Sequence, residues 1–284
     1  MAARFPEWLK KKVPGCKDIQ STRNLIDGLG LNTVCSSARC PNQGECYSRR
    51  TATFLIMGGI CTRGCRFCAV DKGKPLPPDP EEPRKVAGAV AALGLKHAVV
   101  TSVTRDDLPD GGASHFVKTI NAIREMQPGI TVEVLTPDFK GRLRPVDTVA
   151  SARPEVFNHN LETVPRLYRR VRPGSGYRRS LKLLERVKNR EPGVLTKSGL
   201  MVGLGEDFAE IEQVMADLRS AGCDIITIGQ YLQPSRKHLE IKEFVKPEVF
   251  DAYRRAALEM GFKYAVCGPF VRSSYKAGDY LPQG

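Results

Sequence analysis

The chain is organised around the stretch Thr53-Phe-Leu-Ile-Met-Gly-Gly-Ile-Cys-Thr-Arg-Gly-Cys-Arg-Phe-Cys68. Its apolar first half predicts a buried strand that ends at the glycine pair. Cys61, Cys65 and Cys68 follow, with three and two residues between them. Thiols this close together are typical of soft-metal sites, because thiolates bind such metals tightly. Zinc usually takes four ligands, whereas three thiolates leave one iron of a four-iron cluster open to a further ligand.

The composition is that of an ordinary globular protein. The 284 residues are 41% hydrophobic and 26% charged, enough for a sizeable core. No apolar run reaches about 18 residues, so we expect no transmembrane helix. The beginning of the chain lacks the apolar core of a secretory signal, so we expect a cytoplasmic protein whose nine cysteines serve metal or redox chemistry. The formal net charge of +13 predicts attraction to polyanions.

A second group of cysteines precedes the first strand. Cys35, Cys40 and Cys46 are separated by four and five residues, within a turn-rich segment. A loop can fold around a metal that itself supplies the stability, so this trio predicts a small metal site. A zinc ion or buried loop cysteines would explain one such trio alone. Two trios about fifteen residues apart favour metal chemistry.

Strands and helices alternate from residue 52 onward. Strands are predicted at 53–57, 97–103, 131–136, 156–162, 196–204 and 224–229, and helices at 81–93, 113–126, 145–151, 177–190, 207–221 and 247–260. This alternation indicates βα units and a parallel sheet. About six repeats suit an open sheet or a partial barrel. In both, sites form at the carboxyl ends of the strands, where the trio Cys61 to Cys68 falls.

The cysteine spacing after the first strand resembles that of the radical S-adenosylmethionine (SAM) superfamily. The resemblance implies a 4Fe-4S cluster on Cys61, Cys65 and Cys68, whose open iron is chelated by the amino and carboxylate groups of SAM. It also implies that an electron cleaves the sulfonium and gives a 5′-deoxyadenosyl radical, chemistry that side chains alone cannot perform. The implied fold is an α/β partial (β/α)6 TIM-like barrel.

Further motifs resemble the lipoyl synthase family within that superfamily, along nearly the whole chain. They are the spacing of the second trio, Thr101-Ser-Val-Thr-Arg-Asp-Asp-Leu-Pro-Asp-Gly-Gly112, Asn158-His-Asn-Leu-Glu-Thr163 and Gly268-Pro-Phe-Val-Arg-Ser-Ser-Tyr275. The resemblance implies an N-terminal extension (1–50) with the auxiliary cluster ligands, a radical SAM partial barrel (51–270) and a C-terminal tail (271–284). Cys35, Cys40 and Cys46 would hold an auxiliary 4Fe-4S cluster with Ser274 as the fourth ligand.

The reaction implied by the resemblance inserts two sulfur atoms, at C6 and C8 of a protein-bound octanoyl chain, with the auxiliary cluster as sulfur donor and two SAM molecules consumed. The implied partners are an octanoylated lipoyl carrier protein, either the lipoyl domain of a 2-oxoacid dehydrogenase or the glycine cleavage H protein, and an electron donor such as ferredoxin or flavodoxin. We expect a monomer that binds no nucleic acid or membrane. Acidic carriers would suit the +13 charge.

Several polar or glycine positions are candidates for contacts to SAM. The resemblance places Phe67 against the adenine, and the loop around Ser102 and Thr104 near the cofactor's amino group. The remaining candidates are Asn160 and Glu162 for the ribose and Gly205 for a backbone contact to adenine. A loop cap or plain turn explains the polar and glycine positions equally well.

Two other functions compete with this prediction. A radical SAM methylthiotransferase that acts on tRNA or a ribosomal protein also carries two clusters, but it has larger N- and C-terminal domains than this chain offers. A zinc-stabilised nucleic-acid-binding module would use the basic residues that surround Tyr168 and Tyr177. These are Arg169, Arg170, Arg172, Arg178 and Arg179. Basic and aromatic residues together suit RNA, but a patch flanking an acidic substrate is an equal explanation.

Overall fold

The computed structural model of the chain describes residues 5–11 and 16–279. The outermost parts of the predicted extension and tail, 1–4, 12–15 and 280–284, lie outside the described residues, as does the side chain of Cys16. None of the helices in the described part is long and apolar enough to cross a membrane.

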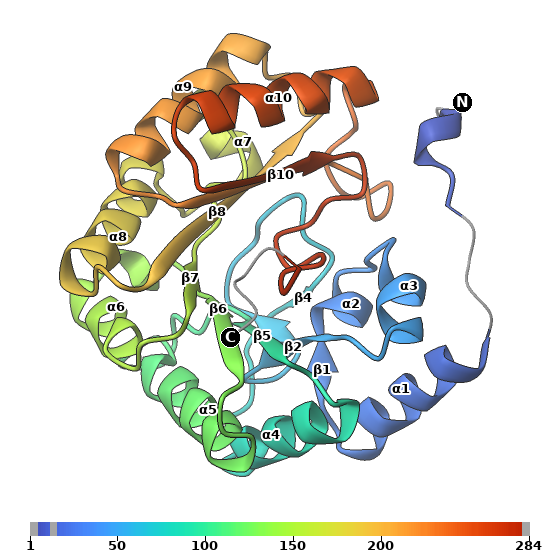
Figure 1. Cartoon of the computed structure of the whole chain (residues 1–284), viewed down its shortest axis with the longest axis vertical. Helices are drawn as coiled ribbons and strands as arrows, with labels where there is room; N and C mark the ends of the chain where they lie inside the picture. Colours follow the sequence, from blue (N-terminus) through green and yellow to red (C-terminus); the bar gives the residue numbers. More distant parts are fainter. Residues whose placement is uncertain (1–4, 12–15, 280–284) are drawn as a thin grey trace.

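One eight-stranded sheet forms the centre of the molecule, in the order β1-β2-β5-β6-β7-β8-β9-β10. The seven strands from β2 to β10 run parallel, and β1 pairs with β2 in the antiparallel direction. Their bounds are β1 Asn32–Thr33, β2 Thr53–Ile56, β5 His97–Ser102, β6 Thr131–Leu135, β7 Val156–Asn158, β8 Leu195–Val202, β9 Ile225–Gln230 and β10 Tyr264–Gly268. The sheet curves into an incomplete ring (Figure 1).

Helices cover the outer face of this ring (Figure 1). Those between the parallel strands are α4 Glu82–Leu93, α5 Ala113–Met126, α6 Leu143–Ala150, α7 Tyr168–Val171, α8 Tyr177–Arg190, α9 Phe208–Ser220 and α10 Pro247–Glu259, with the 3-10 turns η2 Phe139–Gly141 and η3 Pro165–Leu167. Before the first parallel strand lie η1 Glu7–Leu9, α1 Cys16–Gly28, α2 Val34–Ser37 and α3 Gln43–Ser48. The strands β2, β5 and β9 are buried at nearly every position, because helices cover their outer face and other segments of the chain lie inside the ring. Burial on both faces explains their continuous apolar runs.

Local sequence signals account for the ends of the repeats. Pro83 lies in the first turn of α4, and Gly94 ends this helix with a left-handed conformation (φ 68°). At α9 the Asp207 side chain accepts from the Glu210 amide while the Glu210 side chain accepts from the Asp207 amide, a capping box. These signals fix the lengths of the crossovers and therefore where each strand delivers its carboxyl end.

The predicted partial α/β barrel is confirmed, with three additions. β10 continues the parallel series past the six predicted strands, and β1 borders the opposite edge. A small parallel pair, β3 (Ile60–Cys61) with β4 (Asp71–Lys72), encloses the first cysteine loop. The fourth predicted strand was too long: β7 ends at Asn158, so Asn160 and Glu162 lie in the loop after it, although Glu162 bridges to Leu200.

The segment after β10 turns back into the ring (Figure 1). It passes so close to the sheet that two strand positions require glycine. A Cβ on Gly229 would lie 2.0 Å from the Val271 carbonyl oxygen, and one on Gly199 would lie 2.7 Å from Ser273 Oγ. The segment after β10 therefore lies against β8 and β9, because these glycines leave room for its close approach.

Candidate functional site

A cavity of about 1190 Å³ lies inside the ring. Its walls come from the two cysteine segments, the carboxyl ends of the parallel strands, the turns that lead into β5 and β6, and the segment after β10. All six trio cysteines line it: Cys35, Cys40, Cys46, Cys61, Cys65 and Cys68. Ser274 lines it as well. The structure thus brings together two groups of thiols that the sequence separates by a strand.

The first trio occupies the loop that follows β2. Cys61 Sγ accepts hydrogen bonds from the backbone amides of Arg63 at 3.4 Å and Thr104 at 3.3 Å. The two amides therefore fix the position of this sulfur atom in the cavity wall. Burial raises the pKa of the Cys68 thiol to about 12 and also raises that of Cys65. Metal binding would have to displace these protons.

An arginine within this loop fixes it to the loops that follow β5 and β6. The Arg63 guanidinium donates to both Asp106 carboxylate oxygens, at 2.6 and 2.9 Å, and pairs with Asp138 at 2.5 Å. Asp138 is fully buried and also accepts from Arg179 at 3.1 Å. Burial alone would lower the pKa of Arg63, but Asp106 and Asp138 raise it above its ordinary value. The cysteine loop is therefore held by charge pairs that do not involve the thiols.

Replacing Arg63 with methionine should lower the free energy of unfolding by about 3 kcal/mol, because Asp106 and the buried Asp138 would lose their shared cation. Urea unfolding followed by circular dichroism measures this difference. Arg66→Met is the matched control, since Arg66 lies in the same loop with an exposed side chain. It should change stability by less than about 0.5 kcal/mol. Equal losses in the two variants would contradict the assigned role of Arg63.

The loop that follows β9 covers the first trio from the other side. His238 Nε2 lies 3.1 Å from the Cys68 carbonyl oxygen, and the Leu239 amide donates to the Arg66 carbonyl at 3.3 Å. Ser235 Oγ lies 2.9 Å from His238 Nδ1. Because a carbonyl only accepts, Nε2 donates and Nδ1 accepts from the serine hydroxyl. The sequence alone gave no reason to separate His238 from an ordinary surface histidine.

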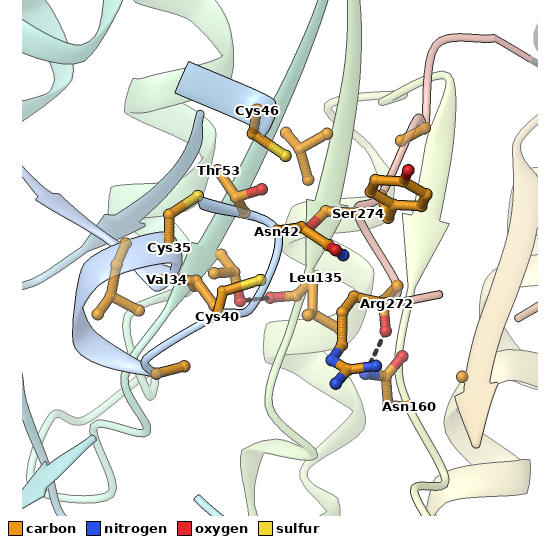
Figure 2. Close-up of a pocket in the computed structure, with 18 of the residues that line it drawn as sticks. Val34, Cys35, Cys40, Asn42, Cys46, Thr53, Leu135, Asn160, Arg272 and Ser274 are labelled. Carbon is orange, nitrogen blue, oxygen red and sulfur yellow. Dashed lines mark hydrogen bonds between the residues drawn. The ribbon is translucent and has the colours of Figure 1, made fainter. Parts of the chain in front are cut away.

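The second trio surrounds another part of the cavity. Cys35 lies on α2, Cys46 on α3 and Cys40 in the loop between them, and their sulfur atoms face the side from which Ser274 approaches (Figure 2). Thr33 caps α2 by accepting from the Ser36 amide. Burial raises the pKa of Cys35 to about 12 and that of Cys46 to about 11. None of the cysteines with described side chains forms a disulfide.

The donors of both trios fit iron–sulfur clusters. No group of three His, Cys, Asp or Glu side chains in the described part of the chain could hold a single metal ion. A four-iron cluster binds each thiolate at a different iron, so its ligands stand farther apart than those of one ion. The arrangement is thus compatible with a cluster at each trio.

Unpartnered polar atoms lie in the same cavity. Ser102 Oγ and Asn160 Oδ1 are buried without a hydrogen-bond partner among the described residues. Such atoms are costly to leave unsatisfied, so a polar ligand is expected beside them. Asn160 Nδ2 donates to Ser273 Oγ at 2.7 Å and to Glu162 Oε1 at 3.1 Å. Phe67 and Thr104 also line the cavity.

Two predicted contacts have distinctive surroundings. Glu162 has a left-handed backbone (φ 70°), and burial raises the pKa of its carboxyl despite nearby Arg172 and Asn160. Gly205 lies away from the residues that line the cavity, and its carbonyl accepts from Arg166 at 2.8 Å instead. The structure therefore gathers every predicted site residue except Gly205.

Sequence reasoning missed two arginines in the cavity. Arg172 is buried, donates to the carbonyl oxygens of Asn160 at 2.7 Å and Leu161 at 3.2 Å, and retains an unpartnered Nε. It belongs to the basic cluster around Tyr168, yet it points inward, while Arg178 stays exposed. Arg272 also lines the cavity, beside Asn160 in Figure 2. The basic cluster around Tyr168 and the polar motif Asn158–Thr163 were the sequence signals near Arg172, and neither indicates that its side chain points inward.

Comparison with known proteins adds family information. The model of the Radical SAM superfamily matches residues 55–218. A lipoyl synthase of Caldanaerobacter subterraneus is 59% identical over 277 residues, covering 98% of this chain and 97% of that protein. A lipoyl synthase of Rubrobacter xylanophilus is 56% identical, covering 96% and 85%.

Solved structures support the fold. Methylornithine synthase superposes with a TM-score of 0.55 at 13% identity, covering 91% of this chain and 84% of that one. The hydrogenase maturase HydG gives a TM-score of 0.56 at 15% identity, covering 88% and 66%.

Proposed function

Because the chain belongs to the lipoyl synthase family of the radical SAM superfamily, we propose a division of labour between its two cysteine trios. Cys61, Cys65 and Cys68 hold the 4Fe-4S cluster that binds SAM. Cys35, Cys40, Cys46 and Ser274 hold the auxiliary 4Fe-4S cluster. The main observation in support of this proposal is that both trios and Ser274 line one cavity.

The family membership establishes the enzyme class: the protein is a sulfur-inserting radical SAM enzyme that uses SAM and 4Fe-4S clusters. When bound, these groups supply the electron transfer, the radical and the sulfur that side chains cannot provide. The methylthiotransferase alternative is not favoured, because relatives more than half identical over nearly the whole chain are lipoyl synthases.

The cavity side chains divide the recognition of SAM among them. Arg172 is the buried cation that would pair with the methionine carboxylate, because its unpartnered Nε lies in the cavity wall. Ser102 and Thr104 would accept from the amino group, and Asn160 and Glu162 would bind the ribose hydroxyls. Phe67 would stack on the adenine. Gly205 does not line the cavity, so the structure does not support a backbone contact to adenine there.

The substrate chain needs an apolar path between the two trios. Apolar side chains from four strands line the cavity, namely Leu55, Val99, Leu135, Leu200 and Met201. They suit a saturated chain and exclude water from a reactive carbon. The family acts on protein-bound octanoyl groups and uses a reductant. Which carrier and which donor serve this protein, its monomeric state and its cytoplasmic location stay predictions.

The decisive assay uses the anaerobically reconstituted full chain, SAM, a reductant and an octanoylated carrier protein. We expect release of 5′-deoxyadenosine and a product that carries two added sulfur atoms, identified by mass. An octanoyl-lysine peptide is the minimal substrate control. The proposal would be rejected if the reconstituted protein contained zinc instead of iron, or if it modified tRNA and not the octanoyl substrate.

A higher salt concentration should weaken binding of the octanoylated carrier protein but not of the octanoyl-lysine peptide. Most exposed charged residues on the cavity lining are basic. They are Arg39, Arg49, Lys96 and Lys276, whereas Asp279 is the one exposed acidic residue among the described lining residues. Raising the salt from low to physiological strength should therefore raise KM for an acidic carrier by about tenfold, with kcat nearly unchanged. The neutral octanoyl-lysine peptide should show less than about a twofold change. A carrier KM that ignores ionic strength would contradict electrostatic docking.

A further inference from the structure

Lys11, in the N-terminal arm, lies where two other segments of the chain meet. Its ammonium pairs with the Glu45 carboxylate and donates to Asn42 Oδ1 at 2.8 Å. The same ammonium lies 5.0 Å from the centre of the Phe270 ring and 5.1 Å from that of Tyr275. One cation therefore contacts both the second cysteine loop and the C-terminal segment.

The residues that it joins are neighbours of the proposed ligands. Glu45 directly precedes Cys46, and Tyr275 directly follows Ser274. The Tyr275 hydroxyl donates to Glu45 Oε1 at 2.9 Å, while Lys11 pairs with Oε2 of the same carboxylate. The position of Ser274 relative to Cys46 is thus set by contacts one residue away from each.

Asn42 provides a second connection between the same two segments. Its side chain is buried, and Nδ2 donates to the Phe270 carbonyl at 2.7 Å. Lys11 holds the opposite end of that amide, because the ammonium can only donate and must face Oδ1. The lysine therefore fixes which way the Asn42 amide points, and with it the bond to the C-terminal segment.

The arm that presents Lys11 is itself anchored. Leu9 is buried, and the Phe5 ring packs against Phe244 with centroids 5.6 Å apart. The Lys11 side chain is only 28% exposed and that of Glu45 17%. A partly desolvated cation attracts aromatic faces and carboxylates more strongly than a fully hydrated one.

We propose that Lys11 is a positioning residue that holds the segment carrying Ser274 against the loop carrying Cys35, Cys40 and Cys46, so that the serine hydroxyl stays directed at the thiols. The functional meaning rests on the proposed auxiliary cluster. The positioning of the C-terminal segment by Lys11 does not depend on that cluster, because Lys11 acts through Asn42, Glu45 and two aromatic rings. A serine ligand that is released during turnover would then remain close enough to bind again.

Hydrogen–deuterium exchange of the reconstituted full chain tests whether Lys11 holds the C-terminal segment in place. In Lys11→Met the backbone amides of Val271 and Tyr275 should exchange about tenfold faster than in the wild type, because two ring contacts and an ion pair are lost. In the structure these amides donate to the Gly268 and Arg272 carbonyls. Lys11→Arg should restore slow exchange, since a guanidinium makes the same kinds of contact.

Lys10→Met is the matched control. It removes the same charge from the same arm, but Lys10 pairs only with Glu7 among the described residues and is half exposed. Exchange in this variant should equal that of the wild type. Unchanged exchange in Lys11→Met, or equal acceleration in both methionine variants, would overturn the proposal.

Iron release to a chelator then tests the link to the cluster. Lys11→Met should lose about four of its eight irons several-fold faster than Lys10→Met does, with the remaining irons unaffected. Release at the wild-type rate would overturn the link. A wild-type chain that never binds more than about four irons would instead reject the proposed auxiliary cluster and leave the exchange result standing.

Discussion

Cys65→Ala should abolish 5′-deoxyadenosine formation and lower the iron content from about eight to about four per chain. Its thiol is one of three that the loop after β2 directs into the cavity, and an alanine side chain offers no ligand atom. The remaining pair would leave two irons without protein ligands, so that cluster should not persist. Anaerobic reconstitution with iron analysis and chromatography of the nucleoside products measures both effects.

Cys223→Ala separates this effect from the loss of any thiol. Cys223 is fully buried in the core beside β9, and its sulfur lies 3.3 Å from the Ile225 carbonyl oxygen. We expect full iron content and normal deoxyadenosine release, with about 1 kcal/mol lower stability. Normal deoxyadenosine release from Cys65→Ala would refute the assignment of the first trio.

Cys40→Ala should uncouple the two halves of the reaction. The first trio keeps its loop and its Arg63 contacts, so deoxyadenosine formation should stay within about threefold of the wild type. Sulfur insertion should fall at least about a thousandfold, because the proposed sulfur donor loses a ligand. Mass analysis of the octanoyl product, beside the deoxyadenosine yield of the same sample, measures the uncoupling.

Ser274→Cys tests the same site without removing a ligand atom. An alkoxide is a poorer partner for iron than a thiolate, so we expect serine to make one iron easier to release when sulfide is taken. The variant should bind both clusters and transfer sulfur more slowly than the wild type. Sulfur transfer by Ser274→Cys at the wild-type rate, with both clusters present, would contradict this explanation.

The Cys40→Ala variant has its own contradicting outcome. Equal losses of deoxyadenosine formation and sulfur insertion in that variant would contradict two separate cluster sites.

The fold was largely predictable because its signals are local. Apolar runs of strand length, the Asp207 cap and the stop at Gly94 depend on residues close in sequence. The missed elements have a different origin. β1 contains two residues and is a strand only because β2 pairs with it, and the true end of β7 follows from the turn that brings Glu162 to Leu200.

The site was predictable where spacing alone carries the chemistry. Both trios are recognisable from intervals of two to five residues, whereas their meeting on one cavity appears only in the structure. Arg172 could not be distinguished from its exposed neighbours, because only the packing of Tyr168 and the turn at Asn160 direct it inward. Gly205 was a candidate for its position near a strand end, which does not reveal the direction that the loop takes.

The sequence by itself determined which atoms are available: soft thiolates in two trios, the hydroxyls of Ser273 and Ser274 near the end of the chain, and repeats that form a parallel sheet. Spacing sets the ligands within a loop, because a few residues of chain cannot separate them far. Only the tertiary structure decided that Ser274 reaches the loop of Cys35, Cys40 and Cys46. That meeting depends on two strand glycines that admit the chain end and on Lys11, and such contacts between distant segments leave no periodic signal in a sequence.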